Sequence, residues 1–341
     1  MRNPRRDARP DAMTDSEAPD VETPETPEDE APPACVMSFN ASDPSGAGGL
    51  AGDVSTIAAM GAHALPVVTS IVLRDTAEVF ESHEIDPDVV VEQARGILED
   101  VTIAAWKVGF LGSAEGVAAV AEILSDYPDV PLVSYLAQVS WLDDDAQQAY
   151  LDAFRELVLP ATEVLVGNQQ TLTDVLLPDW DGERPPSARE LAVAAGEHGT
   201  RYVLVTGIAL PASKGAEGYV DNVLASPQGA ITGEKFERFD ATFVGAGETL
   251  AAALAALLAS DQELHLAVSE ALSFLDQALD AGFRPGMGNV VPDRFFWALP
   301  EAEVEEGAAA SVSPAPMKLA SKRSNFSPVI APCGEASTLS T

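Results

Sequence analysis

Residues 35–56 read CVMSFNASDPSGAGGLAGDVST, and this stretch decides the fold. Cys35–Asn40 is a short apolar run that predicts a buried strand, and the glycine-rich loop Asp43–Gly49 follows before an expected helix. Glycines let a backbone approach a ligand closely, and free N–H groups at a helix N-terminus bind anions. The stretch therefore predicts a strand, an anion-binding loop and a helix, unless the glycines only make a tight, closely packed turn.

Outward from this stretch, strand-like runs alternate with helix-like segments. The expected strands are Cys35–Asn40, Ala64–Leu73, Ile103–Val108, Pro131–Ser134, Val164–Val166 and Tyr202–Thr206, with a hairpin-like pair at Glu217–Ala225 and Lys235–Phe239. The expected helices are Gly46–Gly61 after its glycines, Pro87–Leu98, Glu115–Leu124, Asp144–Leu157, Ser187–Glu197, Gly247–Leu258 and Leu264–Ala281. This repetition predicts an α/β fold with a central, mostly parallel sheet flanked by helices on both faces. Ligands bind such sheets at the carboxyl ends of the strands.

A second glycine loop, Val244–Thr249 (VGAGET), opens an alanine-rich helix. An acid in the first turn, here Glu248, can take a proton from a substrate hydroxyl while the amides hold a transferring phosphoryl group. Alternatively, Glu248 is only a first-turn acid that stabilises the helix dipole. The first loop also fits a loose dinucleotide fingerprint, Gly46-Ala-Gly48-x-x-Ala51 with Asp75 as the ribose acid. That alternative leaves the second loop unexplained.

Both loops, in this order, resemble one family. The chain resembles the hydroxymethylpyrimidine/phosphomethylpyrimidine kinases of thiamine biosynthesis, in the ribokinase-like superfamily, over Val36–Leu299. The resemblance is carried by SDPSGAGGLAGDVST (Ser42–Thr56), AAMGAHALPVVTSI (Ala58–Ile71), KVGFLGS (Lys107–Ser113), LVTG (Leu204–Gly207), GAGETLAAALAALLA (Gly245–Ala259) and AGFRPGMGNVVPDRFFWAL (Ala281–Leu299). It implies a ribokinase-like fold, a homodimer, and transfer of the γ-phosphoryl group of ATP, assisted by Mg²⁺, to a hydroxymethylpyrimidine and then to its monophosphate.

Site residues follow from the resemblance by position. Asp53 and Ala41 are expected to bind the pyrimidine, and Glu248 is expected to act as the catalytic base. The anion hole and the site for the ATP phosphates are expected at Gly245, Ala246, Gly247, Thr206 and Asn168. The sequence assigns no metal ligand.

Several positions depart from the family pattern. Arg74 stands where the family tends to carry a glutamine that pairs with the pyrimidine; a guanidinium only donates hydrogen bonds, so it is expected to grip a phosphate on the substrate. Ser134 and Thr171 stand where the family has acids near the phosphates and the metal, and Glu248 stands where it usually has cysteine. A second hypothesis is therefore a catalytically degenerate pseudokinase that binds a pyrimidine as a sensor or partner protein.

Composition limits the classes of partner. The 341 residues hold 54 acidic and 19 basic side chains, a net charge of −35. This excludes a nucleic-acid binder and disfavours docking on anionic membranes. The acidity indicates either adaptation to high salt or a lineage bias in composition. Residues 1–34 form a Pro-rich acidic segment expected to be disordered, 35–300 the folded kinase domain, and 301–341 a low-complexity tail.

The remaining signals favour ordinary structural roles. Cys35 and Cys333 form no disulfide framework, so a reducing cytoplasm is expected, and no apolar run is long enough to span a membrane. Lys107 is expected to be an exposed lysine in a salt bridge. The other predicted structural roles are packing for Trp106 and Trp141, bracing of the last loop by Arg284, and a helix start at Asp143–Asp145.

Overall fold

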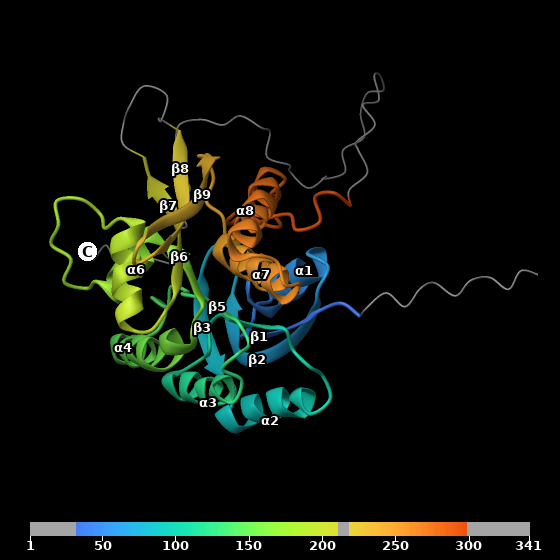
Figure 1. The fold of residues 1–341 in the computed structure, drawn as a ribbon. Helices are drawn as coiled ribbons and strands as arrows, with labels where there is room; N and C mark the ends of the chain where they lie inside the picture. Colours follow the sequence, from blue (N-terminus) through green and yellow to red (C-terminus); the bar gives the residue numbers. More distant parts are fainter. Residues whose placement is uncertain (1–31, 211–217, 299–341) are drawn as a thin grey trace, which may run out of the picture. The chain divides into compact units, whose positions relative to one another are not determined.

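The computed structural model describes residues 32–210 and 218–298, and a single nine-stranded sheet lies at its centre (Figure 1). The strands are β1 Cys35–Ser42, β2 His63–Arg74, β3 Val79–Glu84, β4 Ala105–Val108, β5 Leu132–Tyr135, β6 Val164–Asn168, β7 Tyr202–Ala209, β8 Tyr219–Ser226 and β9 Gly229–Glu237. Their order in the sheet is β3-β2-β1-β4-β5-β6-β7-β8-β9. The strands from β2 to β7 in this order are parallel, and β3, β8 and β9 pair antiparallel at the two edges.

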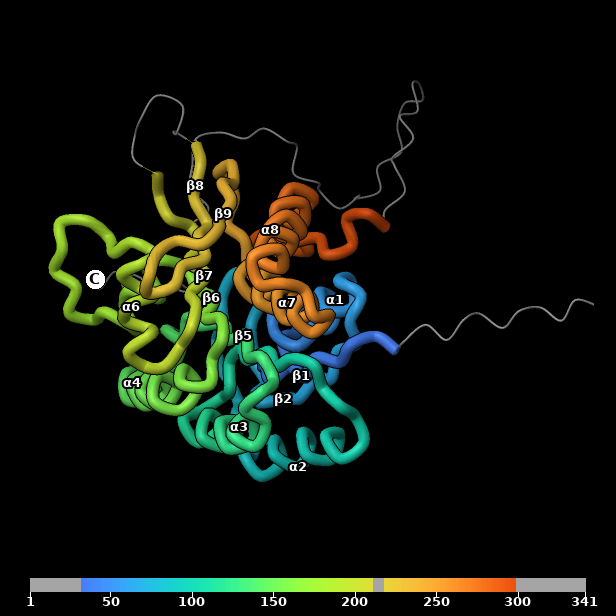
Figure 2. Tube along the Cα trace, viewed as in Figure 1, coloured from blue at the N-terminus to red at the C-terminus, as the bar shows by residue number. Residues whose placement is uncertain are grey.

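Helices cover both faces of the sheet, as Figures 1 and 2 show. Their bounds are α1 Gly49–Ala59, α2 Pro87–Leu98, α3 Ala114–Ser125, α4 Asp144–Ala153, α5 Gln169–Leu176, α6 Ala188–Glu197, α7 Ala246–Ala259 and α8 Leu264–Asp280. Helices α1, α7 and α8 pack over one face, and α2 to α6 contribute to the apolar layer on the other. The predicted α/β architecture is confirmed.

Alternation along the central strands sets which side chains meet which helices. In β1, Met37 and Phe39 belong to the apolar layer under α2 and α3, whereas Val36 belongs to the layer under α7. Side chains alternate along a strand, so Ser38 and Asn40 share the face of Val36 and lie under α1 and α7. This face therefore changes from apolar to polar as β1 approaches its carboxyl end.

Most element bounds agree with the sequence predictions to within a few residues. The edge strand β3 and the short helix α5 were missed. β3 is exposed over most of its length, and α5 is amphipathic but only eight residues long. The helix expected over Asp144–Leu157 ends at Ala153 and continues as a π-helical turn, Phe154–Val158. Asp143 accepts the N–H of Ala146 as the helix N-cap, which confirms the predicted helix start.

Some sequence predictions lie outside the described residues. These are residues 1–31 of the segment 1–34 expected to be disordered, the tail 301–341, Cys333, and Glu217 at the start of the hairpin-like pair. The boundaries of the folded domain stay predictions. Within 32–210 and 218–298, the helices are all too short or too polar to cross a bilayer.

The order of the strands indicates where the sheet binds a ligand, at the carboxyl ends of β1 and its neighbours. β1 lies between β2 and β4 in the sheet. The connection from β1 to β2 and the later connection to β4 therefore run to opposite sides of β1. Loops after two such strands diverge and leave a crevice at their carboxyl ends, where open α/β sheets bind ligands. The strand beyond β2 is the antiparallel β3. This order differs from that of dinucleotide-binding sheets, which removes the support for the alternative of a dinucleotide-binding site at the first glycine loop.

Candidate active site

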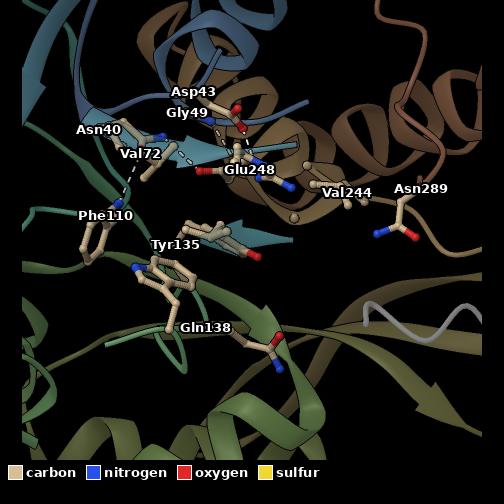
Figure 3. Close-up of a pocket in the computed structure, with 18 of the residues that line it drawn as sticks. Asn40, Asp43, Gly49, Val72, Phe110, Tyr135, Gln138, Val244, Glu248 and Asn289 are labelled. Carbon is tan, nitrogen blue, oxygen red and sulfur yellow. Dashed lines mark hydrogen bonds and ion pairs between the residues drawn. The ribbon is translucent and has the colours of Figure 1, made fainter. Parts of the chain in front are cut away.

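A cavity opens at this edge of the sheet, and we call it the first cavity (Figure 3). Its walls come from the ends of β1, β2 and β5, the loop after β4, and the N-terminus of α7. Asn40, Gly49 and Glu248 lie together on one side of it, and Gln138 lies on the other. Apolar and aromatic walls with a few polar groups are typical of sites for small heterocyclic ligands. The apolar and aromatic lining residues include Val72, Val79, Phe110, Tyr135 and Trp141.

The first glycine loop is organised by Asp43. Its Oδ1 accepts hydrogen bonds from the N–H and the hydroxyl of Ser45, at 2.8 and 2.6 Å, and its Oδ2 accepts the N–H of Gly48 at 3.2 Å. Oδ2 also pairs with Nη1 of Arg74 at 3.1 Å. Arg74 lines the cavity, and its charge is shared with the loop carboxylate of Asp43.

The second glycine loop packs directly against the first. Gly245 has a φ of +82°, and a Cβ atom there would lie 1.6 Å from the carbonyl oxygen of Ala47. Glu248, in the first turn of α7, accepts the N–H of Gly49 at Oε2 (3.0 Å) and an amide N–H of Asn40 at Oε1 (3.1 Å). The two loops, about two hundred residues apart in sequence, therefore meet at one carboxylate.

Arg294, which the sequence analysis missed, forms hydrogen bonds to the first loop and to the start of α7. Arg294 is 6% exposed; it donates to the carbonyls of Gly46 and Ala47 in the first loop and to Oγ1 of Thr249 in α7. Burial lowers the pKa of its guanidinium, while the carboxylates of Glu248, Asp53 and Asp43 oppose that shift. The planar fork of an arginine suits this multiple contact.

Replacing Arg294 by methionine is expected to destabilise the fold by ~1–3 kcal/mol, because the buried carbonyls of Gly46 and Ala47 lose their donor. Urea unfolding measures this effect. Arg294→Lys should recover part of it, since a lysine keeps the charge but lacks the fork. A Met variant as stable as the wild type would contradict this role.

Tyr135, which the sequence analysis also missed, lies in the wall of the first cavity. It follows Ser134, one of the positions that depart from the family pattern. Ser134 is fully buried and its hydroxyl pairs with that of Thr162 at 2.9 Å, facing away from the cavity. Tyr135 lines the cavity, and its ring packs against Gly247, where a Cβ atom would lie 2.4 Å from it. Burial, and next the charge of Glu248, raise the pKa of the Tyr135 phenol, so it stays a neutral hydrogen-bond donor.

Asp53 and Lys107 lie one layer below the cavity. Both are fully buried, and Lys107 Nζ pairs with Asp53 Oδ2 at 2.8 Å. The expectation of an exposed Lys107 is wrong, because this residue lies within β4 and faces α1 and α7. Asp53 does not line the first cavity, so the structure gives it no direct path to a pyrimidine; it contacts Ser38 and Asn40 instead, at 2.7 and 2.9 Å. Ala41 does line the cavity.

A second cavity lies on the far side of the N-terminus of α7. It is mainly apolar, with walls from β7, β8, β9, α7 and α8, and it includes Thr206 and Gly207. Ala246 and Gly247 line both cavities. The structure thus brings Thr206 together with the second glycine loop. Asn168 is elsewhere: its side chain accepts the N–H of Thr171 as the N-cap of α5, and it lines neither cavity.

The residues present do not form a Mg²⁺ site of protein ligands alone. Within the described ranges, no group of three or more His, Cys, Asp or Glu side chains is placed to hold a metal. The carboxylates that line the first cavity are Asp43 and Glu248, and each already accepts hydrogen bonds at both oxygens. The absence of acids at Ser134 and Thr171 agrees with this arrangement.

Comparison with solved structures defines the class of fold. The pyridoxal kinase of Bacillus subtilis, solved as an ADP complex, matches with a TM-score of 0.68 over 79% of this chain and 100% of that chain, at 21% identity. The architecture is therefore that of the ribokinase-like α/β fold. The family model for phosphomethylpyrimidine kinase matches residues 43–293, and the chain belongs to that family.

Relatives of known name agree with this assignment and confirm the resemblance. The hydroxymethylpyrimidine/phosphomethylpyrimidine kinase of Streptomyces coelicolor is 30% identical over 274 residues, which cover 79% of this chain and 97% of that protein. The thiamine biosynthetic bifunctional enzyme of Arabidopsis thaliana is 32% identical over 254 residues. That match covers 72% of this chain but only 46% of the plant protein.

Proposed function

We propose that this chain is an ATP-dependent kinase that phosphorylates hydroxymethylpyrimidine or its monophosphate, in thiamine biosynthesis. The observation that carries the proposal is that Glu248 lines the first cavity while Ala246 and Gly247, at the N-terminus of α7, lie between the two cavities. The first cavity suits the heterocycle, and the apolar second cavity suits the adenine of ATP. Phosphates bound between the two would lie at the N-terminus of α7, where free N–H groups favour anions.

The transfer itself needs a base and a site for negative charge. The acceptor oxygen of the substrate attacks the γ-phosphorus, the bond to the β,γ-bridging oxygen breaks, and ADP leaves with that oxygen. When the acceptor is a hydroxymethyl group, its proton passes to Glu248. Amides of Gly245, Ala246 and Gly247 stabilise the charge on the transferring group, and the neutral Tyr135 phenol is an additional donor at this wall.

Mg²⁺ enters this proposal only as the counter-ion that accompanies ATP. Mg²⁺ commonly keeps several waters and binds substrate phosphates with one or two carboxylates. Because the described residues provide no dedicated cluster, the metal is expected to be held mainly by the nucleotide.

An assay for pyrimidine-dependent ADP formation tests the function. With ATP, Mg²⁺ and hydroxymethylpyrimidine, the wild type should form ADP and a phosphorylated pyrimidine in equal amounts. Calorimetry on the same protein separates the alternative: tight pyrimidine binding without ADP formation and without Mg·ATP binding would favour the non-catalytic sensor or partner protein.

We also propose that the chain works as a homodimer in a reducing cytoplasm. Ile71 and Leu73 of β2 and Phe80 of β3 are large apolar side chains that are 41–59% exposed near one edge of the sheet. Exposed apolar groups gathered in this way favour an interface. The chain has only two cysteines, which favours a reducing compartment such as the cytoplasm.

Arg74→Gln is expected to weaken binding of the phosphorylated pyrimidine about 10- to 100-fold, because a hydrogen bond to a charged group contributes ~1.5–3 kcal/mol. Arg74 is the one cationic side chain among the described residues that line the first cavity. Calorimetry with the phosphorylated and the unphosphorylated pyrimidine measures the effect. Arg95→Gln, which removes an exposed ion pair with Asp126, is the matched control. Equal losses for both ligands would contradict a phosphate contact.

A further inference from the structure

Asn40 lies between the two carboxylates of the site. It is 1% exposed at the carboxyl end of β1. Its Nδ2 donates to Asp53 Oδ2 at 2.9 Å and to Glu248 Oε1 at 3.1 Å. Its Oδ1 accepts the N–H groups of Ala41 and Phe110, at 2.9 and 3.1 Å.

These four contacts fix the orientation of the amide. A backbone N–H can only donate, so the atom that faces Ala41 and Phe110 must be the oxygen. The NH₂ group therefore faces the two carboxylates, and each of its protons has one acceptor. Oε1 of Glu248 must then act as an acceptor, and Oε2 already accepts the N–H of Gly49. Both oxygens of Glu248 are therefore held in place as hydrogen-bond acceptors.

Asp53 and Lys107 hold Asn40 from below. Oδ2 of Asp53 accepts hydrogen bonds from Nδ2 of Asn40, the hydroxyl of Ser38 and Nζ of Lys107, all within 2.9 Å, while its Oδ1 has no hydrogen-bond partner among the described residues. The charge of Lys107 compensates the Asp53 carboxylate, so Asn40 adds a neutral link between Asp53 and Glu248. Three buried side chains thus connect the sheet to the carboxylate at the cavity.

We propose that Asn40 is a positioning residue that aims Glu248 at the substrate hydroxyl, and that the buried Lys107–Asp53 pair anchors Asn40; this inference rests on the proposed role of Glu248 as the base. The substrate proton passes to a free lone pair of Glu248 while the Asn40 and Gly49 contacts persist. The Asn40 side chain packs closely against Gly109, where a Cβ atom would lie 2.5 Å from it.

The first arm of the test needs no turnover. In ¹⁵N-labelled full-length protein, the side-chain amide signal of Asn40, assigned by its loss in Asn40→Ala or Asn40→Asp, should shift in Glu248→Ala. It should stay in place in Thr200→Val, which loses one buried hydrogen bond at the opposite end of the strands. An Asn40 signal indifferent to Glu248→Ala would overturn the proposal.

The second arm is kinetic. Asn40→Asp keeps the acceptor for Ala41 and Phe110 but replaces the donor to Glu248 by a carboxylate oxygen that repels it, so kcat should fall at least about tenfold while KM for the pyrimidine changes less than about threefold. The variant adds one carboxylate next to Glu248 and Asp53. The other charged and titratable groups around Glu248, namely Arg74, Asp43, Lys107, Arg294 and Tyr135, are unchanged in it.

The two arms separate this inference from the proposed function. A kcat like that of Thr200→Val would overturn the positioning role even in an active kinase. A wild type that forms no ADP, but whose Asn40 signal follows Glu248→Ala, would overturn the kinase proposal and support the contact.

Discussion

Glu248→Gln is expected to lower kcat for hydroxymethylpyrimidine by ~10²–10⁴-fold, the range of general acid–base catalysis. Glutamine has nearly the same size, but its amide cannot accept the substrate proton. It also offers one acceptor atom to the two donors, Asn40 Nδ2 and the N–H of Gly49, that hold both oxygens in the native site. Steady-state kinetics at saturating Mg·ATP measure the effect.

The split between the kinetic constants is informative here. KM for the pyrimidine should change little, because the walls of the first cavity stay in place and only the proton acceptor is lost. Thermal unfolding of the variant serves as the control for its fold. A kcat within tenfold of the wild type would show that Glu248 serves the helix dipole and not the chemistry.

Lys107→Met is expected to reduce the free energy of unfolding by ~3–5 kcal/mol, the cost of breaking a buried ion pair by removing one partner. Both Lys107 and Asp53 are fully buried, so the variant leaves the Asp53 carboxylate without its cation. Urea unfolding measures the loss. Such a loss is a large part of the ~5–15 kcal/mol that stabilises a typical domain.

A matched control and a second variant sharpen this prediction. Arg184→Met removes the exposed pair with Glu190 and should cost at most ~1 kcal/mol. The double variant Lys107→Met/Asp53→Leu should recover much of the loss, since no buried charge remains. A single variant that matches Arg184→Met in stability would contradict the buried pair.

The fold was largely predictable because its signals are local. Apolar runs alternate with helical segments, and glycine loops mark the points where strands pass into helices. Alternation also carries information that was left unused: CVMSFN and AWKV each place a polar residue inside an apolar strand. In a sheet buried on both faces such residues need partners, so Lys107 was predictable as a buried ion.

The site was predictable only in part, because its contacts are long-range. Glu248, Ala41 and Arg74 line the first cavity and Thr206 lines the second, while the roles expected of them stay predictions. Arg294 and Tyr135 carry no local signal: each acquires its role from a loop or helix distant in sequence. Asn168 was misplaced because a helix N-cap and a phosphate ligand require the same short polar side chain.

The central claim is that Glu248 and the α7 N-terminus transfer a phosphoryl group from ATP to a pyrimidine. ³¹P NMR of the wild type with Mg·ATP and hydroxymethylpyrimidine tests this most directly. The account predicts a new phosphomonoester signal that grows in step with ADP, requires the pyrimidine, and is lost in Glu248→Gln. ATP hydrolysed to inorganic phosphate, or left intact while the pyrimidine binds, would contradict it.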